Sequence, residues 1–103
     1  METLRERIKR LLIETEFPLS VDEIAFSLGL DPKDKNIIYE HLKHIAKTIR
    51  RESRGELMLY MIPPKCRNCG YIFKSLNKPK KPSKCPKCYS QRIDAPKFII
   101  ERV

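Results

Sequence analysis

Hydrophobic residues recur at helical spacing in three stretches of the first half of the chain. The first two stretches begin with capping-box pairs, Thr3 with Glu6 and Ser20 with Glu23, which mark helix starts. The third follows Asp31, an aspartate placed to act as an N-cap. The pattern therefore predicts helices over about residues 3–15, 20–28 and 33–51.

Two later apolar runs, residues 56–62 and 97–103, are bounded by prolines and predict strands. An isolated strand leaves its backbone groups unsatisfied, so the two runs are expected to pair antiparallel. A further short strand is expected near residues 17–19. Together these elements predict an α+β fold, a winged helix-turn-helix. Its expected domain is residues 1–62 completed by strand 96–103, with residues 63–95 inserted in the wing as a zinc ribbon.

The inserted segment contains all four cysteines of the chain, arranged as two C-x2-C pairs. Two such turns facing each other form a tetrahedral sulfur site that suits structural Zn2+. Gly70 follows the first pair, where a metal-binding turn often needs a positive φ, whereas Tyr89 follows the second. Two disulfides, in an oxidising compartment, and iron, in a rubredoxin-like site, are the alternatives. The expected ligands are Cys66, Cys69, Cys85 and Cys88.

Positive charge is concentrated in the same segment. Residues 63–95 carry nine Lys and Arg against one acidic residue, whereas residues 1–62 carry eleven of each sign. Bound Zn2+ and four thiolates would leave the segment at +6, which points to a polyanion, most often nucleic acid. Short ribbon strands are expected at residues 71–73 and 91–93. The loop between the pairs is either a solvated loop or a phosphate-binding arm with Lys74, Lys78, Lys80, Lys81 and Lys84.

The third predicted helix has an apolar seam and a largely basic opposite face. Helix 20–28, a turn and this helix form a helix-turn-helix pattern, in which the second helix enters the DNA major groove. Asn36 and Lys43 could read bases, and the remaining cations would contact phosphates. A solvated face that binds protein or nothing is the alternative. His41 and His44 are expected to be flank or surface residues. The expected DNA-binding residues are Lys33, Asn36, Tyr39, Lys43, Lys47, Arg50 and Arg51.

The chain shows no membrane or export signal. Met1 leads directly into a charged amphipathic stretch, and no apolar run approaches the ~20 residues that span a membrane. The protein is therefore expected in the cytoplasm with reduced thiols, which favours metal over disulfides.

Four segments carry a resemblance that covers essentially the whole chain: residues 19–25, 39–47, 66–71 and 81–88. Through them the chain resembles a small archaeal family of predicted transcriptional regulators. The resemblance implies a winged helix-turn-helix fused to a rubredoxin-like zinc ribbon.

The expected function is that of a DNA-binding transcriptional regulator, with double-stranded DNA as partner, helix 33–51 in the major groove and the basic ribbon on the DNA backbone. The alternative is a protein-interaction adaptor of the transcription machinery, which the balanced charge of residues 1–62 favours. Electron transfer through iron is a third hypothesis. The sequence contains no nucleophile–base pair, phosphate loop or open metal position, so no enzyme activity is expected.

Overall fold

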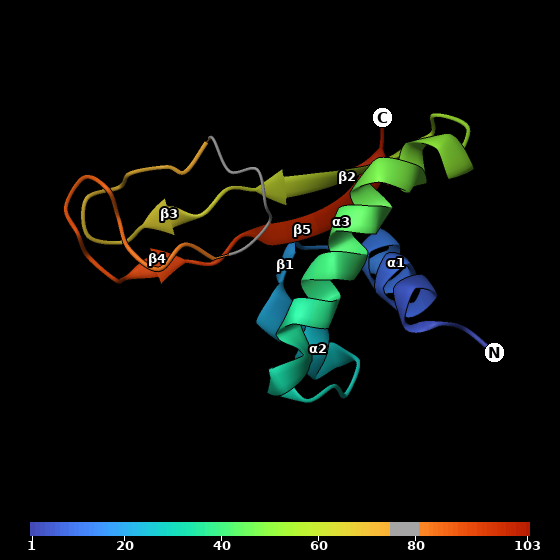
Figure 1. Ribbon diagram of the computed structural model, residues 1–103. Helices are drawn as coiled ribbons and strands as arrows, with labels where there is room; N and C mark the ends of the chain where they lie inside the picture. The colour runs from blue at the N-terminus through green and yellow to red at the C-terminus, as the bar shows by residue number, and fades with distance from the viewer. Residues whose placement is uncertain (75–80) are drawn as a thin grey trace.

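The computed structural model describes residues 1–74 and 81–103 and has an α+β architecture (Figure 1). Its helices are α1 (Leu4–Glu14), α2 (Val21–Ser27), the short 3-10 helix η1 (Pro32–Asp34) and α3 (Lys35–Glu52). Its strands are β1 (Leu19–Ser20), β2 (Leu57–Ile62), β3 (Lys65–Cys66), β4 (Ile93–Asp94) and β5 (Lys97–Arg102). The three predicted helices and the α+β class are confirmed. Among the described residues, none of the helices is both long and apolar enough to cross a membrane.

Helices α1 and α2 begin with the same pair of hydrogen bonds. In α1, the Glu6 backbone N–H donates to the Thr3 hydroxyl at 3.2 Å, and the Thr3 N–H donates to the Glu6 carboxylate at 3.4 Å. Ser20 and Glu23 repeat this arrangement in α2 at 3.2 and 3.0 Å. Because nearby side chains satisfy amides that lack intrahelical partners, both helices begin where the sequence predicts.

The start of α3 differs from the prediction. The Asp31 carboxylate accepts a hydrogen bond from the Lys33 N–H at 2.9 Å, and the Asp31 carbonyl accepts one from the Asp34 N–H at 2.9 Å. These bonds close the tight turn η1, and the α-helix begins only at Lys35, whose Nζ pairs with Asp22 of α2 at 2.6 Å. Lys33 therefore lies on the turn before α3, because Asp31 caps a 3-10 turn instead of the α-helix itself.

Strand β5 is the centre of an antiparallel three-stranded sheet with the order β1-β5-β2. Its register pairs Phe98 with Leu19 of β1 and with Met61 of β2. Phe98 and Ile100 point to the helices and complete a core with buried residues of α1, α2 and α3. The helical members of this core are Ile8, Leu12, Val21, Ile24, Ala25, Ile38, Leu42, Ile45 and Ile49.

The cysteine-containing segment leaves the sheet at the end of β2 and returns at the start of β5, and Ile62 pairs with Lys97 where the two strands meet. In Figure 1 it extends to one side of the helices and contains the two-stranded sheet β3-β4. The predicted strands at 71–73 and 91–93 are largely wrong. Only an isolated bridge joins Ile72 to Lys65, and β4 begins at Ile93. The carbonyls of Tyr71 and Ser90 instead accept hydrogen bonds from the backbone N–H groups of Cys66 and Cys85.

Candidate metal centre and nucleic-acid interface

The first cysteine pair lies on a tight turn that its own backbone closes. The Gly70 N–H donates to the Cys66 carbonyl at 2.9 Å, and the Cys66 N–H donates to the Tyr71 carbonyl at 2.8 Å. Gly70 has φ +81°, a left-handed conformation that penalises a Cβ. The turn buries Cys66 and leaves Cys69 exposed.

The second pair forms a matching turn without a glycine. The Tyr89 N–H donates to the Cys85 carbonyl, and the Cys85 N–H donates to the Ser90 carbonyl, both at 2.9 Å. Tyr89 has φ +62°, so it adopts the same left-handed conformation as Gly70. Its ring lies 4.8 Å from the Lys84 ammonium, a cation–π contact. The second turn therefore has the same backbone geometry as the first, although tyrosine takes the place of glycine.

Adding a Cβ at Gly70 is expected to weaken metal binding. A Cβ built there meets nothing within 4 Å, so the whole effect of Gly70→Ala comes from the positive φ. That conformation costs about 1–2 kcal/mol, and we expect metal affinity to fall roughly five- to thirtyfold. A competition titration with a zinc chelator measures the change. Lys87→Ala, in the facing turn, is the control and should bind like the wild type, and an unchanged Gly70→Ala affinity would contradict this role.

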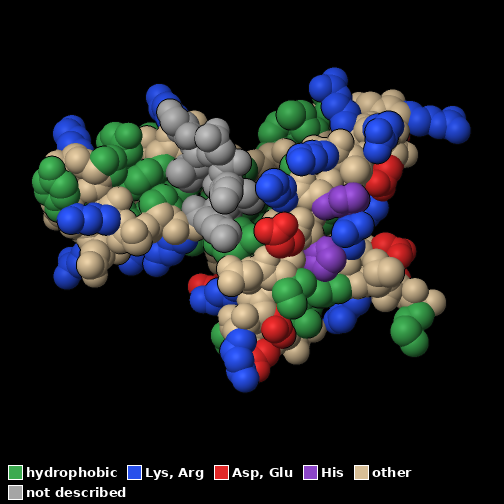
Figure 2. Space-filling model, in the orientation of Figure 1, with side chains coloured by type: hydrophobic (Ala, Val, Ile, Leu, Met, Phe, Trp, Pro, Cys, Tyr) green, Lys and Arg blue, Asp and Glu red, His purple; other side chains and the backbone are tan. Residues whose placement is uncertain are grey.

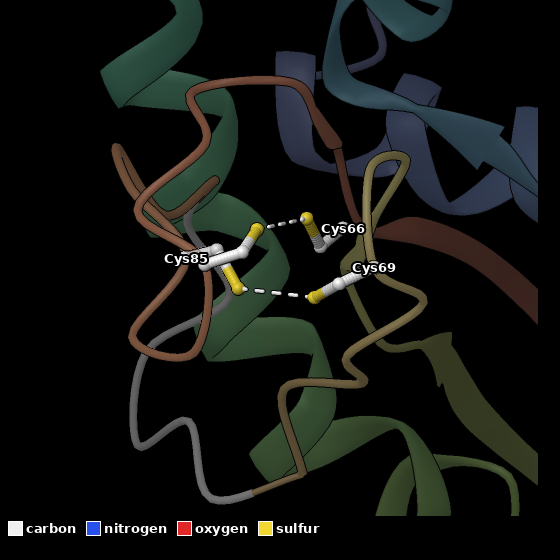
Figure 3. A group of neighbouring side chains, drawn as sticks. Cys66, Cys69 and Cys85 are labelled. Carbon is white, nitrogen blue, oxygen red and sulfur yellow. Dashed lines mark hydrogen bonds between the residues drawn. The ribbon is translucent and has the colours of Figure 1, made fainter.

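The two turns bring the four cysteine sulfurs together. Figure 3 shows the side chains of Cys66, Cys69 and Cys85 converging from facing turns. The Cys66 and Cys88 sulfurs are 3.5 Å apart, those of Cys69 and Cys85 are 3.6 Å apart, and all four lie within 4.8 Å of one another. A Zn–S bond of about 2.3 Å implies tetrahedral sulfur–sulfur edges of about 3.8 Å. A disulfide would need about 2.05 Å, so this arrangement fits a four-coordinate metal and not two disulfides.

Hydrogen bonds around the sulfurs favour thiolates at one side of the site. The Asn68 side-chain amide, 3.4 Å from the Cys88 sulfur, and the Ser90 backbone N–H lower the pKa of the Cys88 thiol to about 6. The Tyr71 backbone N–H lowers the pKa of Cys69, but desolvation and the neighbouring sulfurs outweigh it and raise that pKa to about 12. One thiolate raises the pKa of a neighbouring thiol, because two negative charges repel each other. A bound cation would neutralise this repulsion and favour the thiolate form of all four cysteines.

The exposed face of α3 carries five of the seven side chains that were predicted to contact DNA from the third helix. Figure 2 shows Lys and Arg side chains along this face and around the ribbon. The predicted DNA contacts that are exposed on α3 are Asn36, Lys43, Lys47, Arg50 and Arg51. Lys33 is also exposed but lies on η1.

Tyr39 departs from the prediction because it is half-buried. Its ring packs against the helical core, and burial raises the pKa of its phenol. The nearby backbone N–H of Lys81 partly offsets that rise in pKa. Asn36, Tyr39 and Lys81 also line one small pocket. Tyr39 therefore lies where the ribbon segment meets α3, a contact that helical periodicity alone does not reveal.

The predicted loop lysines fall into two groups. Lys74, Lys81 and Lys84 are exposed, whereas Lys78 and Lys80 lie outside the described residues. The ribbon also exposes four basic side chains that were not predicted as DNA contacts. They are Lys65, Arg67, Lys87 and Arg92. Arg67 is ion-paired with Asp94, which leaves the other three as additional free cations of the described ribbon surface.

An open cavity of about 870 Å³ lies where α2 and the end of β2 meet the ribbon. Its lining includes residues of both charge signs. The charged members of the lining are Asp22, Glu23, Asp94, Lys65, Arg67, Lys81 and Lys97. Because acidic groups offset most of the basic ones, the cavity is a weaker anion site than the exposed face of α3.

Comparisons with known proteins cover both parts of the chain. A family described as PF0610-like, N-terminal matches residues 3–58, and one described as the PF0610 rubredoxin-like zinc beta-ribbon domain matches residues 63–103. The chain is also similar to the solution NMR structure of protein PF0610 from Pyrococcus furiosus, with 38% identity and a TM-score of 0.72. That similarity covers 96% of this chain and 89% of the other. No curated protein gives a significant match.

Proposed function

Because the chain belongs to the PF0610-like family, with its rubredoxin-like zinc β-ribbon, we propose that it is a DNA-binding transcriptional regulator of the winged helix-turn-helix type. In this proposal α3 enters the major groove, and β2 and β5 form the wing. The ribbon, residues 63–95, replaces the tip of the wing and contacts the DNA backbone.

The observation that best supports this proposal is the row of exposed cations on α3. Lys43, Lys47 and Arg50 follow one another at spacings of three or four residues, so they share one helix face. Tyr39 of α3 and Lys81 of the ribbon line the same small pocket, which supports a basic ribbon beside that face. One duplex can therefore meet both surfaces, with α3 at base edges and the ribbon at neighbouring phosphates.

We propose Zn2+ as the resident metal, held by all four cysteines in a structural role. Four protein ligands complete a tetrahedral shell and leave no position for water or substrate, which is typical of structural and not catalytic zinc. Metal analysis of the isolated protein tests the choice. Stoichiometric zinc in a colourless protein supports it, and the visible absorbance of an iron–thiolate centre would replace it with iron.

Removing one charge from α3 is expected to weaken the salt dependence of DNA binding. Each phosphate contact contributes about 0.9 to the slope of log K against log salt, so Lys47→Gln should make the slope shallower by about that amount. Fluorescence anisotropy with a labelled duplex over a salt series measures it. Arg10→Gln on α1 is the matched control and should keep the wild-type slope. Equal slopes in both variants would contradict a contact between α3 and the DNA.

A protein-interaction adaptor is the second candidate. Phe17 and Phe26 are 70% and 88% exposed, so both rings are available for apolar contact with a protein partner. An adaptor would show little DNA affinity at physiological salt, and it would retain a polymerase subunit or basal factor in a pulldown. Phe26→Ser should then abolish retention, whereas a DNA-binding regulator should bind its duplex unchanged after the same substitution.

A further inference from the structure

Strand β2 lies at the edge of the three-stranded sheet, because β5 separates it from β1 (Figure 1). Residues 57–62 read Leu-Met-Leu-Tyr-Met-Ile, with no charge and no proline. Natural edge strands usually carry charged residues, a proline or a bulge, which prevent pairing with another strand. Its six-residue register with β5 is continuous, so this edge also lacks a bulge.

The hydrogen bonds of the sheet show which backbone groups β2 directs away from β5. The Val103 N–H donates to the Glu56 carbonyl at 2.9 Å, so Glu56 begins the series of residues that bond to β5. Antiparallel ladders alternate, and the next residue, Leu57, must therefore direct its groups outward. Contacts with the Ser53 side chain confirm that Leu57 directs its backbone groups away from β5. The Ser53 hydroxyl accepts from the Leu57 N–H at 2.9 Å and lies 3.5 Å from the Leu57 carbonyl.

By the same alternation, Leu59 and Met61 also direct their N–H and C=O groups outward. Among the described residues, β5 is the only strand paired with β2, so these four groups have no strand partner. Beyond Met61 the outward position belongs to Pro63, which has no N–H. The free edge is therefore short and bounded, at one end by the Ser53 cap on Leu57 and at the other by Pro63.

The outer face of β2 is apolar as well. Met58, Tyr60 and Ile62 are 37%, 39% and 49% exposed, and they alternate with the residues that point to the helices. Ile99, directly opposite Tyr60 on β5, points to the same face but is already buried. A strand that pairs with this edge would thus also cover apolar surface.

We propose that β2 pairs antiparallel with β2 of a second copy of this chain, with Tyr60 opposite the partner's Tyr60. This register places Leu59 opposite the partner's Met61, so the four outward groups of each copy form four hydrogen bonds across the edge. It also places Leu57, already capped by Ser53, opposite the partner's Pro63, which has no N–H to offer. No other antiparallel register centred on a residue of β2 pairs all four outward groups and also places Leu57 opposite the partner's Pro63.

The charges that flank β2 favour the same orientation. Glu56 precedes the strand and Lys65 follows it, and both are exposed. Antiparallel pairing brings Glu56 to the end of the partner strand that carries Lys65, whereas parallel pairing would place like charges together. The edge is thus complementary to itself in hydrogen bonds, apolar contact and charge. Pairing through β2 does not depend on DNA binding.

Sedimentation equilibrium of the full-length, metal-loaded protein from micromolar to millimolar concentration is the first test. We expect a monomer–dimer equilibrium whose dissociation constant rises at least about tenfold in Tyr60→Lys, since two like charges would then face each other. Tyr71→Lys is the matched control, because Tyr71 on the ribbon is 38% exposed. A monomeric wild type over the whole range, or equal effects of the two variants, would overturn the proposal.

Cross-linking tests the register. In a non-hydrogen-bonded antiparallel pair the opposed Cα atoms are about 4.5 Å apart, within disulfide range. Metal-loaded Tyr60→Cys should therefore form a covalent dimer under mild oxidation. Met58→Cys, one position along on the same face, faces the partner's Ile62 and should not. Equal cross-linking of both variants, or of neither, would contradict a pairing centred on Tyr60.

Discussion

Removal of the metal is expected to unfold the ribbon while α1, α2 and α3 keep their helical structure. Among the ribbon residues that the structure describes, the core has four buried members, Cys66, Phe73, Cys85 and Ile93, and the sheet has two strands of two residues each. So little apolar surface cannot offset the conformational entropy of ordering the segment. In zinc peptides the metal supplies about 10–16 kcal/mol of apparent folding free energy, and the same dependence is expected here.

The helical core should survive this loss with reduced stability. Its buried residues form a cluster separate from the ribbon core. However, β5 returns to β2 only after residues 63–96, and closing a flexible loop of that length costs about 3 kcal/mol. We therefore expect metal-free protein to keep its helical ellipticity at low temperature but to unfold at a lower temperature than the metal-loaded form.

Heteronuclear NMR of chelator-treated protein and of Cys85→Ser measures both effects. Ribbon amides should collapse to random-coil shifts, and amides of the helices should remain dispersed. Ser83→Ala, two residues before the ligand and exposed, is the control and should keep the ribbon spectrum. Dispersed ribbon amides without metal, or complete loss of helical ellipticity at low temperature, would contradict the separation of the two cores.

Features fixed by neighbouring residues could be predicted from the sequence. The capping boxes at Thr3 and Ser20 lie within one helical turn of the amides they satisfy, so the starts of α1 and α2 follow from local chemistry. The spacing of the two cysteine pairs likewise predicts the turns that bring four sulfurs together. The left-handed conformation of Gly70 was expected from its residue type.

Features that depend on distant contacts were missed. Tyr39 lies on the side of α3 that meets Lys81, and helical periodicity contains no information about where a segment more than forty residues later will pack. The ribbon strands were misplaced because pairing of Cys66 with Ile93 follows from the sulfur cluster and not from β propensity. Tyr89 shows the same limit, since the closing hydrogen bonds of its turn override the usual preference of tyrosine for negative φ.

Phe98→Ala is expected to destabilise the helical core strongly while leaving the metal site intact. Phe98 is 1% exposed in the central strand of the main sheet, and its ring belongs to the core formed with α1, α2 and α3. Truncation of a buried phenylalanine typically costs about 3–5 kcal/mol. In a domain of this size that loss should lower the melting temperature by more than ~10 °C. Circular dichroism of the metal-loaded variant measures it.

The cobalt-substituted protein separates this effect from a loss of the ribbon. Phe98 is not part of the ribbon cluster, so the thiolate–cobalt absorption of Phe98→Ala should match that of the wild type at low temperature and persist above the helical transition. Lys97→Ala, the exposed neighbour in the same strand, is the control and should change neither signal. If absorption and ellipticity were lost together, the main sheet and the ribbon would unfold as one cooperative unit. The metal would then stabilise the helices that we propose to contact DNA, as well as the ribbon beside them.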